Sequence, residues 1–250
     1  MKKLTVVILT KNESANIVDC ITNVEEVSED ILVIDSGSTD DTVQLAKTAG
    51  ARVVYRKWDE DFAAQRNFAL ENTDAEWILY LDADERLNDK LIESVKIAVN
   101  DNKNECYEIR RINCALGYPF HHGVYGPDKV VRLFKQGHFQ YVNKIHEHAE
   151  CKDPCKMLSG EIEHYTTPTW EQVWQKTEQY TTIWAENAFA NGKRTNIWQA
   201  YMHVIGGFLK VYFFQLGFLD GVMGWEVSVH HAKYTYMKYA KLLALQRSKE

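Results

Sequence analysis

The segment Trp77-Ile78-Leu79-Tyr80-Leu81-Asp82-Ala83-Asp84-Glu85 is a run of five apolar or aromatic residues that ends on two carboxylates separated by one residue. An unbroken apolar run without a helical period predicts a strand buried on both faces, as in the middle of a parallel sheet. Ligands of open α/β sheets gather at the carboxyl ends of the strands. Because side chains two residues apart point the same way, Asp82 and Asp84 can share a divalent cation or its ligand. A solvated exit from the strand is the alternative explanation.

Short apolar runs alternate with helical patterns upstream of this segment. We expect strands over residues 4–9, 30–35, 51–55 and 77–81 and helices over residues 15–24, 42–49 and 62–71. Strands that alternate with helices predict a parallel sheet with right-handed crossovers. Polar side chains follow successive strands at the same edge of that sheet, namely Thr10, Glu13, Asp35, Asp82 and Asp84.

Composition limits the class of protein. The 250 residues are 45% hydrophobic and 12% aromatic, which predicts a folded chain with a large core. The net charge of -6 argues against nonspecific nucleic-acid binding, and we expect no nucleic-acid partner. The five cysteines are odd in number and mostly scattered, which suits a reducing compartment better than a disulfide framework. The amino-terminus runs into a strand without a cleavable signal, so we expect an intracellular protein.

The sequence lacks two common phosphate-binding loops. It contains neither Gly-x-Gly-x-x-Gly nor Gly-x-x-x-x-Gly-Lys-Ser/Thr, so a metal ion and side chains would have to hold a diphosphate. A carboxylate at a strand end, such as Asp35, can accept hydrogen bonds from a base or ribose, and Arg66 can neutralise phosphate. A cation at Asp84 would then lie on the diphosphate.

Four short motifs occur in a fixed order along the chain. They are Val6-Val7-Ile8-Leu9-Thr10-Lys11-Asn12-Glu13, Ile34-Asp35-Ser36-Gly37-Ser38-Thr39-Asp40, Gln65-Arg66-Asn67 and Leu81-Asp82-Ala83-Asp84. Together they resemble glycosyltransferase family 2, whose members have the GT-A fold. The resemblance implies a nucleotide-sugar donor, an Mn²⁺ or Mg²⁺ ion and inversion at the anomeric carbon of the sugar.

The same resemblance implies roles for individual residues. The residues implied in nucleotide-sugar binding are Thr10, Asn12, Glu13, Asp35, Arg66 and Asp82. Thr10, Glu13 and Asp35 would contact the uridine. Arg66 would face the nucleotide or diphosphate, Asp82 the ribose or sugar, and Asp84 the metal.

The fold class that follows is α/β, with a GT-A, Rossmann-like, mostly parallel central sheet, helices on both faces and a C-terminal helical extension. We place a GT-A catalytic domain at residues 1–168, with a nucleotide-sugar binding half at 1–100 and an acceptor half at 101–168. Residues 169–250 would form a helical, membrane-associating region.

A candidate general base lies further along the chain. The order Pro127-Asp128-Lys129-Val130-Val131-Arg132-Leu133-Phe134, a Gly turn and then Ile145-His146-Glu147 resembles a branch of family 2 that includes lipopolysaccharide inner-core β-1,4-glucosyltransferases. Inverting transfer needs a base, usually a carboxylate, within hydrogen-bond reach of the acceptor hydroxyl. Glu147 is the first candidate and Asp128 the second.

Histidines and cysteines gather between residues 146 and 164. The group is His146, His148, Cys151, Cys155 and His164. Its spacing is a weak match to a tetrahedral zinc site, which stays an alternative. By the family resemblance, His164 is instead a third protein ligand of the donor's metal, and an ordinary strand-end histidine is the other explanation.

The character of the chain changes after residue 168. Helical spacing predicts a helix from Trp170 to Ala188, whereas residues 197–225 are aromatic but too polar to predict a membrane-spanning helix. Residues 226–250 form a basic, aromatic helical pattern that suits the surface of an anionic bilayer. We therefore expect a cytoplasmic protein that is peripheral on the inner face of the plasma (inner) membrane. Packing onto the GT-A core or into a homodimer is the alternative.

The sequence thus predicts a metal-dependent inverting hexosyltransferase that moves glucose from UDP-glucose to a hydroxyl of a lipid-linked glycan, the lipopolysaccharide or lipooligosaccharide inner core. A capsule, teichoic-acid or protein acceptor is an alternative within the same family. Two other classes are a sugar nucleotidyltransferase, disfavoured because no Gly-rich activating loop is present, and a non-catalytic nucleotide-sugar binding module.

Overall fold

A computed structural model describes residues 4–144 and 147–248. The chain divides into two compact units. The first, here called the sheet unit, comprises Met1–Arg111 and Asp128–His164. The second, the helical unit, comprises Ile112–Pro127 and Tyr165–Glu250.

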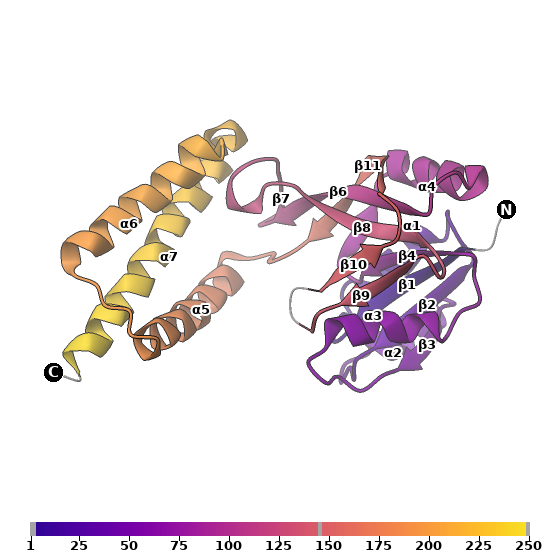
Figure 1. The fold of residues 1–250 in the computed structure, drawn as a ribbon, viewed down its shortest axis with the longest axis horizontal. Coiled ribbons are helices and arrows are strands. Elements are labelled where there is room, and N and C mark those ends of the chain that lie inside the picture. The colour runs from indigo at the N-terminus through magenta and orange to yellow at the C-terminus, as the bar shows by residue number, and fades with distance from the viewer. Residues whose placement is uncertain (1–3, 145–146, 249–250) are drawn as a thin grey trace. The chain divides into compact units, whose positions relative to one another are not determined.

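The central sheet has the strand order β3-β2-β1-β4-β8-β6-β11-β5 (Figure 1). The strands in this order are β1 (Leu4–Thr10), β2 (Asp30–Asp35), β3 (Arg52–Tyr55), β4 (Trp77–Asp82), β5 (Glu85–Leu87), β6 (Cys106–Ala115), β8 (Asp128–Lys135) and β11 (Lys156–Tyr165), and a ninth strand, β7 (Tyr118–Phe120), pairs with β6. β1 pairs in parallel with β2 and β4, and β2 pairs in parallel with β3. β8 is antiparallel to β4 and β6, and β5 is antiparallel to β11. The first strands therefore have the predicted parallel arrangement, and the later strands add antiparallel pairs.

Helices cover both faces of the sheet. They are α1 (Ile17–Val24), α2 (Thr42–Thr48), α3 (Phe62–Leu70) and α4 (Asp89–Asp101). α1, α2 and α4 share one hydrophobic core with the sheet. α3 packs into the other core, together with the hairpin of β9 (Phe139–Val142) and β10 (His148–Cys151). The α/β fold class is confirmed.

β4 lies between β1 and β8, in the middle of the sheet as predicted. Each residue from Trp77 to Leu81 is 0% exposed, so the strand is buried on both faces. The other strands and helices predicted in the first 82 residues are also present, with their ends shifted by at most two residues.

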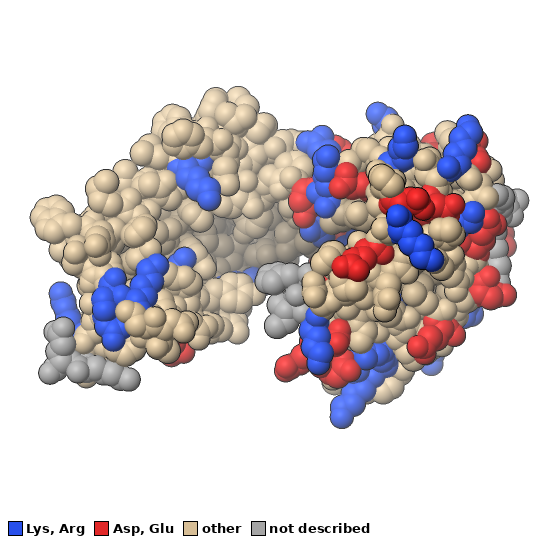
Figure 2. All heavy atoms as spheres, viewed as in Figure 1, with Lys and Arg blue, Asp and Glu red and all other residues tan. Residues whose placement is uncertain are grey.

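The helical unit contains the long helices of the chain. After β7 (Tyr118–Phe120) and η1 (Gly123–Tyr125) come α5 (Trp170–Ala190), α6 (Ile197–Leu209), η2 (Lys210–Phe214), η3 (Gly217–Asp220) and α7 (Gly221–Arg247). α7 packs against both α5 and α6, around Ala185, Ala200, Tyr239 and Leu242. On the face seen in Figure 2, charged side chains crowd the sheet unit, whereas the helical unit is mostly uncharged with a few Lys and Arg groups.

Among the described residues, no single helix is both long and apolar enough to cross a membrane. One bent pair meets the criteria of length and composition when its parts are taken together. It consists of Ile197–Phe214 and Gly217–Arg247, which meet at 68°.

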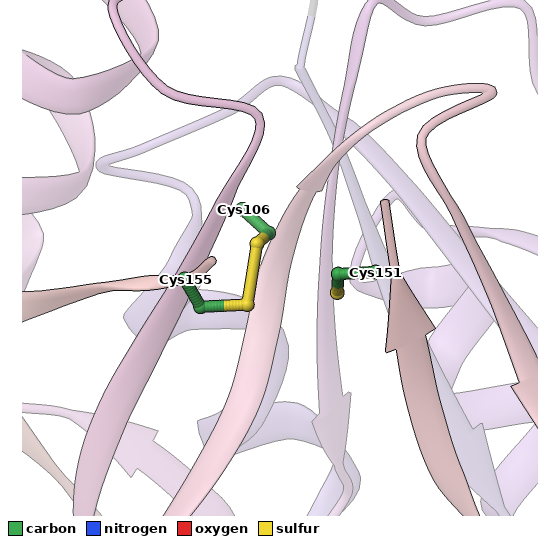
Figure 3. A group of neighbouring side chains, drawn as sticks. All are labelled: Cys106, Cys151 and Cys155. Atoms are coloured by element: carbon green, nitrogen blue, oxygen red, sulfur yellow. A yellow bond between two sulfur atoms is a disulfide. The ribbon is translucent and has the colours of Figure 1, made fainter. Parts of the chain in front are cut away.

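Three cysteine sulfurs lie within 4.8 Å of one another in the sheet unit (Figure 3). Cys106 and Cys155 form a disulfide, and Cys151 has a free thiol beside it. The sequence did not predict this disulfide, because the chain folds back over 49 residues to bring the pair together. The zinc group suggested by spacing does not form among the described residues, since His164 lies beside Asp84 and His148 beside Glu150; His146 lies outside them.

Candidate active site

The carboxyl ends of the parallel strands bring the predicted polar residues together. In the register of the sheet, Thr10 lies opposite Asp35, and Leu9 lies opposite Asp82. The backbone N–H of Ala83 donates to the carbonyl of Leu9, so the acidic turn after β4 is fixed to the end of β1. The predicted meeting of Thr10, Asp35 and Asp82 at one edge is confirmed.

Asp82 lies between two buried arginines. Arg66 Nη2 on α3 donates to Asp82 Oδ1 at 3.1 Å, and Arg132 Nη2 on β8 donates to Oδ2 at 2.8 Å. Both arginine side chains are 6% exposed, whereas Asp82 is 32% exposed. Burial would raise the pKa of Asp82, but the Arg132 and Arg66 guanidinium groups outweigh it and hold the pKa well below its ordinary value. Asp82 is therefore a fixed, ionised carboxylate.

The charge network continues to Glu85, whose side chain is 0% exposed. Arg132 Nη2 donates to Glu85 Oε1 at 2.9 Å, and Arg111 Nη1 donates to the same oxygen at 3.1 Å. The backbone N–H of Asp82 donates to Glu85 Oε2 at 3.0 Å. Buried charges persist when they are paired and hydrogen-bonded in this way. The sequence alone did not predict that Glu85, Arg111 and Arg132 belong to this network.

The two candidate bases lie at opposite ends of the network. Arg111 makes a bidentate pair with Asp128, at 3.0 Å and 2.7 Å. Glu147 Oε1 lies 3.5 Å from both Nε and Nη2 of Arg66. Alternating acids and arginines thus connect Asp128 with Glu147 through Glu85 and Asp82. Asp128 has both oxygens engaged, whereas the contacts to Glu147 use one oxygen at the limit of hydrogen bonding.

Arg66 has remaining capacity to bind an anion. Its guanidinium carbon lies 5.2 Å from the centre of the Tyr141 ring and 6.0 Å from that of Tyr80, so cation–π contacts help to hold it in position. Its Nη1 is buried and has no hydrogen-bond partner among the described residues. An orphaned buried donor of this kind commonly serves a ligand or an ordered water.

Asp84 and His164 meet two residues beyond Asp82. His164 Nε2 lies 3.2 Å from Asp84 Oδ2, and the side chains are 20% and 25% exposed. The pairing of β5 with β11 accounts for this contact, because it sets His164 opposite Glu85. Burial lowers the pKa of His164, but the hydrogen bond to Asp84 outweighs it and raises the pKa above its ordinary value. Asp84 and His164 therefore form a hydrogen-bonded pair that is partly exposed to solvent.

Thr10 and Asp35 are buried polar residues at the carboxyl ends of β1 and β2. Both are 4% exposed. Thr10 Oγ1 is buried and has no partner among the described residues. Asp35 accepts from the backbone N–H groups of Gly37 at 2.9 Å and Ser38 at 3.2 Å, so its carboxylate also shapes the turn after β2.

Asn12 and Glu13 lie in the turn after β1. Asn12 Oδ1 accepts from the N–H of Thr39 at 2.8 Å, which ties this turn to the one after β2. Glu13 Oε2 accepts from Asn16 Nδ2 at 2.7 Å. Burial raises the pKa of Glu13 above its ordinary value, and the nearby carboxylate of Asp84 adds to the effect. A bound cation would relieve this crowding of carboxylates.

A parallel sheet that ends on an acidic turn, is extended by antiparallel strands and is covered by helices on both faces has the arrangement of a GT-A-like fold. The chain belongs to Glycosyl transferase family 2, whose model matches residues 5–216.

Three relatives illustrate the similarity. The chain is 28% identical over 255 residues to a Rickettsia prowazekii protein named an uncharacterized glycosyltransferase, over 97% of this chain and 87% of that one. It is also 28% identical over 253 residues to the lipopolysaccharide core biosynthesis glycosyltransferase LpsC of Rhizobium meliloti, over 96% and 91%. A crystal structure of glucosyl-3-phosphoglycerate synthase from Mycobacterium tuberculosis, with Mn²⁺, UDP and phosphoglyceric acid, matches with a TM-score of 0.37 and 22% identity, over 45% of this chain and 43% of that chain.

Proposed function

We propose that the protein is a metal-dependent inverting hexosyltransferase that moves glucose from UDP-glucose to a hydroxyl of a lipid-linked glycan, in the inner core of lipopolysaccharide or lipooligosaccharide. The observation that carries the proposal is the convergence of Asp84 and His164, 3.2 Å apart, beside the ionised Asp82. The acceptor class is supported by the relative named for lipopolysaccharide core biosynthesis, since its alignment covers nearly all of both chains.

The donor would lie along the edge formed by the strand ends. The uridine would contact Thr10, Glu13 and Asp35, and the buried Thr10 hydroxyl has unused hydrogen-bonding capacity for it. Asn12 would support this pocket by holding the turn after β2. The diphosphate would meet Arg66 Nη1, which also lacks a partner among the described residues. Asp82 would accept hydrogen bonds from the ribose or the sugar, because its two arginines keep it ionised and oriented.

Asp84 and His164 fit a divalent cation. Their facing atoms are one carboxylate oxygen and one imidazole nitrogen, and both side chains are partly open to solvent. Mg²⁺ prefers oxygen ligands alone, so this mixed pair favours Mn²⁺ over Mg²⁺. When bound, the cation would offset the charge that develops on the departing diphosphate.

Glu147 would act as the general base. Its contacts to Arg66 use one oxygen at 3.5 Å, whereas both oxygens of Asp128 are engaged by Arg111. Glu147 would accept the proton of the acceptor hydroxyl as that oxygen attacks the anomeric carbon. Attack opposite the departing diphosphate forms one bond as the other breaks, which inverts the configuration.

The proposal is tested by incubating the protein with UDP-glucose and Mn²⁺ and measuring release of UDP. We expect slow UDP release without acceptor, stimulation by deacylated inner-core oligosaccharide and a weaker response to other UDP-sugars. Formation of UTP with pyrophosphate would indicate a nucleotidyltransferase instead. Binding of UDP-glucose without any turnover would indicate a nucleotide-sugar binding module.

A further inference from the structure

The helical unit exposes many large apolar side chains. Thirteen of the 24 large hydrophobic residues exposed in the described chain fall between residues 197 and 225. They are Ile197, Trp198, Tyr201, Met202, Ile205, Leu209, Phe213, Phe214, Leu216, Phe218, Leu219, Val222 and Trp225. Trp198, Phe214 and Val222 are 78%, 83% and 73% exposed. We call this group, on α6, η2, η3 and the start of α7, the apolar corner.

The inner side of the corner is already used in folding. Ala200 is buried against the core of the helical unit, and His203 stacks on Tyr239 with ring centres 4.4 Å apart. A side chain at Gly207 would lie 3.2 Å from Thr235 Oγ1, so α6 approaches α7 closely at this point. The exposed face is therefore the outward side of a packed helix, which intramolecular packing leaves open to solvent.

The apex of the corner is held in shape by hydrogen bonds within the helical unit. Asp220 is 4% exposed and accepts from the backbone N–H groups of His121 at 3.2 Å and His122 at 2.8 Å. His122 Nδ1 also contacts Asp220 at 3.0 Å. Leu216 adopts a left-handed conformation with φ of 59°, which breaks the helix between η2 and η3. The exposed phenylalanines therefore lie on either side of a break in the helix that buried hydrogen bonds of Asp220 hold in place.

The charges around the corner are mostly positive, although the exposed Glu226 directly follows Trp225. Between residues 197 and 225 the charged residues are Lys210 and Asp220, and Asp220 is buried. Residues 193–248 contain seven Lys or Arg against two Asp or Glu, although the whole chain has a net charge of -6. Figure 2 shows blue groups beside a broad uncharged surface on this unit. A second copy would bring two positive surfaces together, whereas an anionic bilayer complements them.

We infer that the apolar corner inserts into one leaflet of an anionic bilayer. Aromatic and aliphatic side chains with basic residues beside them are the pattern of interfacial membrane-binding helices. The inference rests on the helical unit alone and goes beyond the proposed sugar transfer. It differs from the sequence prediction in placing the inserted surface at residues 197–225 rather than in the basic pattern of residues 226–250.

The test is flotation of the full chain with vesicles of phosphatidylcholine containing 30% phosphatidylglycerol. The variant Trp198→Ser/Phe214→Ser/Val222→Ser removes three of the most exposed side chains. Burying each of these side chains contributes about tenfold to partitioning, so we expect at least about a hundredfold weaker binding. The control Ile97→Ser/Met157→Ser/Ile183→Ser alters exposed residues elsewhere and should bind as the unaltered protein does. Circular dichroism checks that both variants fold.

Other outcomes of the flotation test support or overturn the inference. Weaker binding to pure phosphatidylcholine, or in high salt, would support the role of the basic residues. Equal binding by the two variants, or no binding by the unaltered protein, would overturn the inference. A dimer that the corner variant converts to monomer, without vesicle binding, would show that a second copy covers the corner. The flotation assay contains no donor sugar and measures membrane binding alone. A negative result in this assay therefore leaves the proposed transfer reaction unaffected.

Discussion

Replacing Arg132 with Met should destabilise the sheet unit strongly. The substitution keeps most of the apolar stem but removes the guanidinium that donates to Asp82 at 2.8 Å and to Glu85 at 2.9 Å. Removing one partner of a buried ion pair costs about 3 to 5 kcal/mol. Asp82 keeps Arg66 and Glu85 keeps Arg111, so we expect a value at the lower end, about 3 kcal/mol.

The assay is urea unfolding followed by circular dichroism at pH 7. Arg110→Met is the matched control, because Arg110 pairs with Glu161 at 2.8 Å but is 48% exposed. An exposed pair of this kind contributes less than about 1 kcal/mol. Adding Glu85→Gln to Arg132→Met should recover part of the loss, since the stranded carboxylate is then neutral.

Equal unfolding free energies for Arg132→Met and Arg110→Met would refute this reasoning. So would a double variant as unstable as the sum of its single changes, because the cycle would then show no coupling between Arg132 and Glu85. Equal values would mean that the buried pairs of Arg132 contribute no more than the exposed pair of Arg110, and additive changes would mean that Arg132 does not stabilise Glu85.

Two other predictions concern the general base and pH. Glu147→Gln should lower the rate of transfer to acceptor by about 10² to 10⁴ while leaving binding of UDP intact, and Asp128→Asn should change it by less than about tenfold; the reverse order would assign the base to Asp128. Burial lowers the pKa of His230 to about 4, below the ordinary histidine value of about 6.5. The folded protein therefore favours the neutral ring, and this contribution to stability is fully present above pH 6.5. It is lost as the pH falls from 6.5 toward 4. The loss between pH 7 and pH 5 should be about 1 to 2 kcal/mol in thermal unfolding and should shrink in His230→Gln, and an unchanged pH dependence in that variant would contradict the assignment.

The elements of the parallel half were predictable because their signals are local. The run Trp77-Ile78-Leu79-Tyr80-Leu81 allows burial on both faces, and the alternation of short strands and helices fixes the parallel arrangement. The same alternation predicts that Thr10, Asp35 and Asp82 lie at one edge of the sheet, and the register of β1 with β2 and β4 agrees.

The ion-pair network was not predictable from spacing. Arg132 reaches Glu85 from 47 residues away, through the antiparallel pairing of β8 with β4. The disulfide of Cys106 and Cys155 depends on a similar return of the chain. Contacts set by the register of distant strands leave no periodic signal in the sequence. The one local signal is the position of the acidic Glu85 directly after Asp84.

The exposed face of the helical unit could not be predicted from the sequence. Helical periodicity identified α5 within two residues, but periodicity alone does not tell which face of α6 meets another helix. Ala200 turns inward and Trp198 outward, and this follows from the packing of α6 on α7. The exposed surface therefore became apparent only with the fold.

The most direct test of the account is the position of Mn²⁺ in crystals soaked with Mn²⁺ and UDP, located by anomalous scattering. We expect a peak within coordination distance of both Asp84 and His164, in contact with the diphosphate of UDP. Asp84→Ala crystals should lose that peak while keeping the fold. A manganese ion bound elsewhere with UDP, or UDP bound away from the ends of β1, β2 and β4, would contradict it.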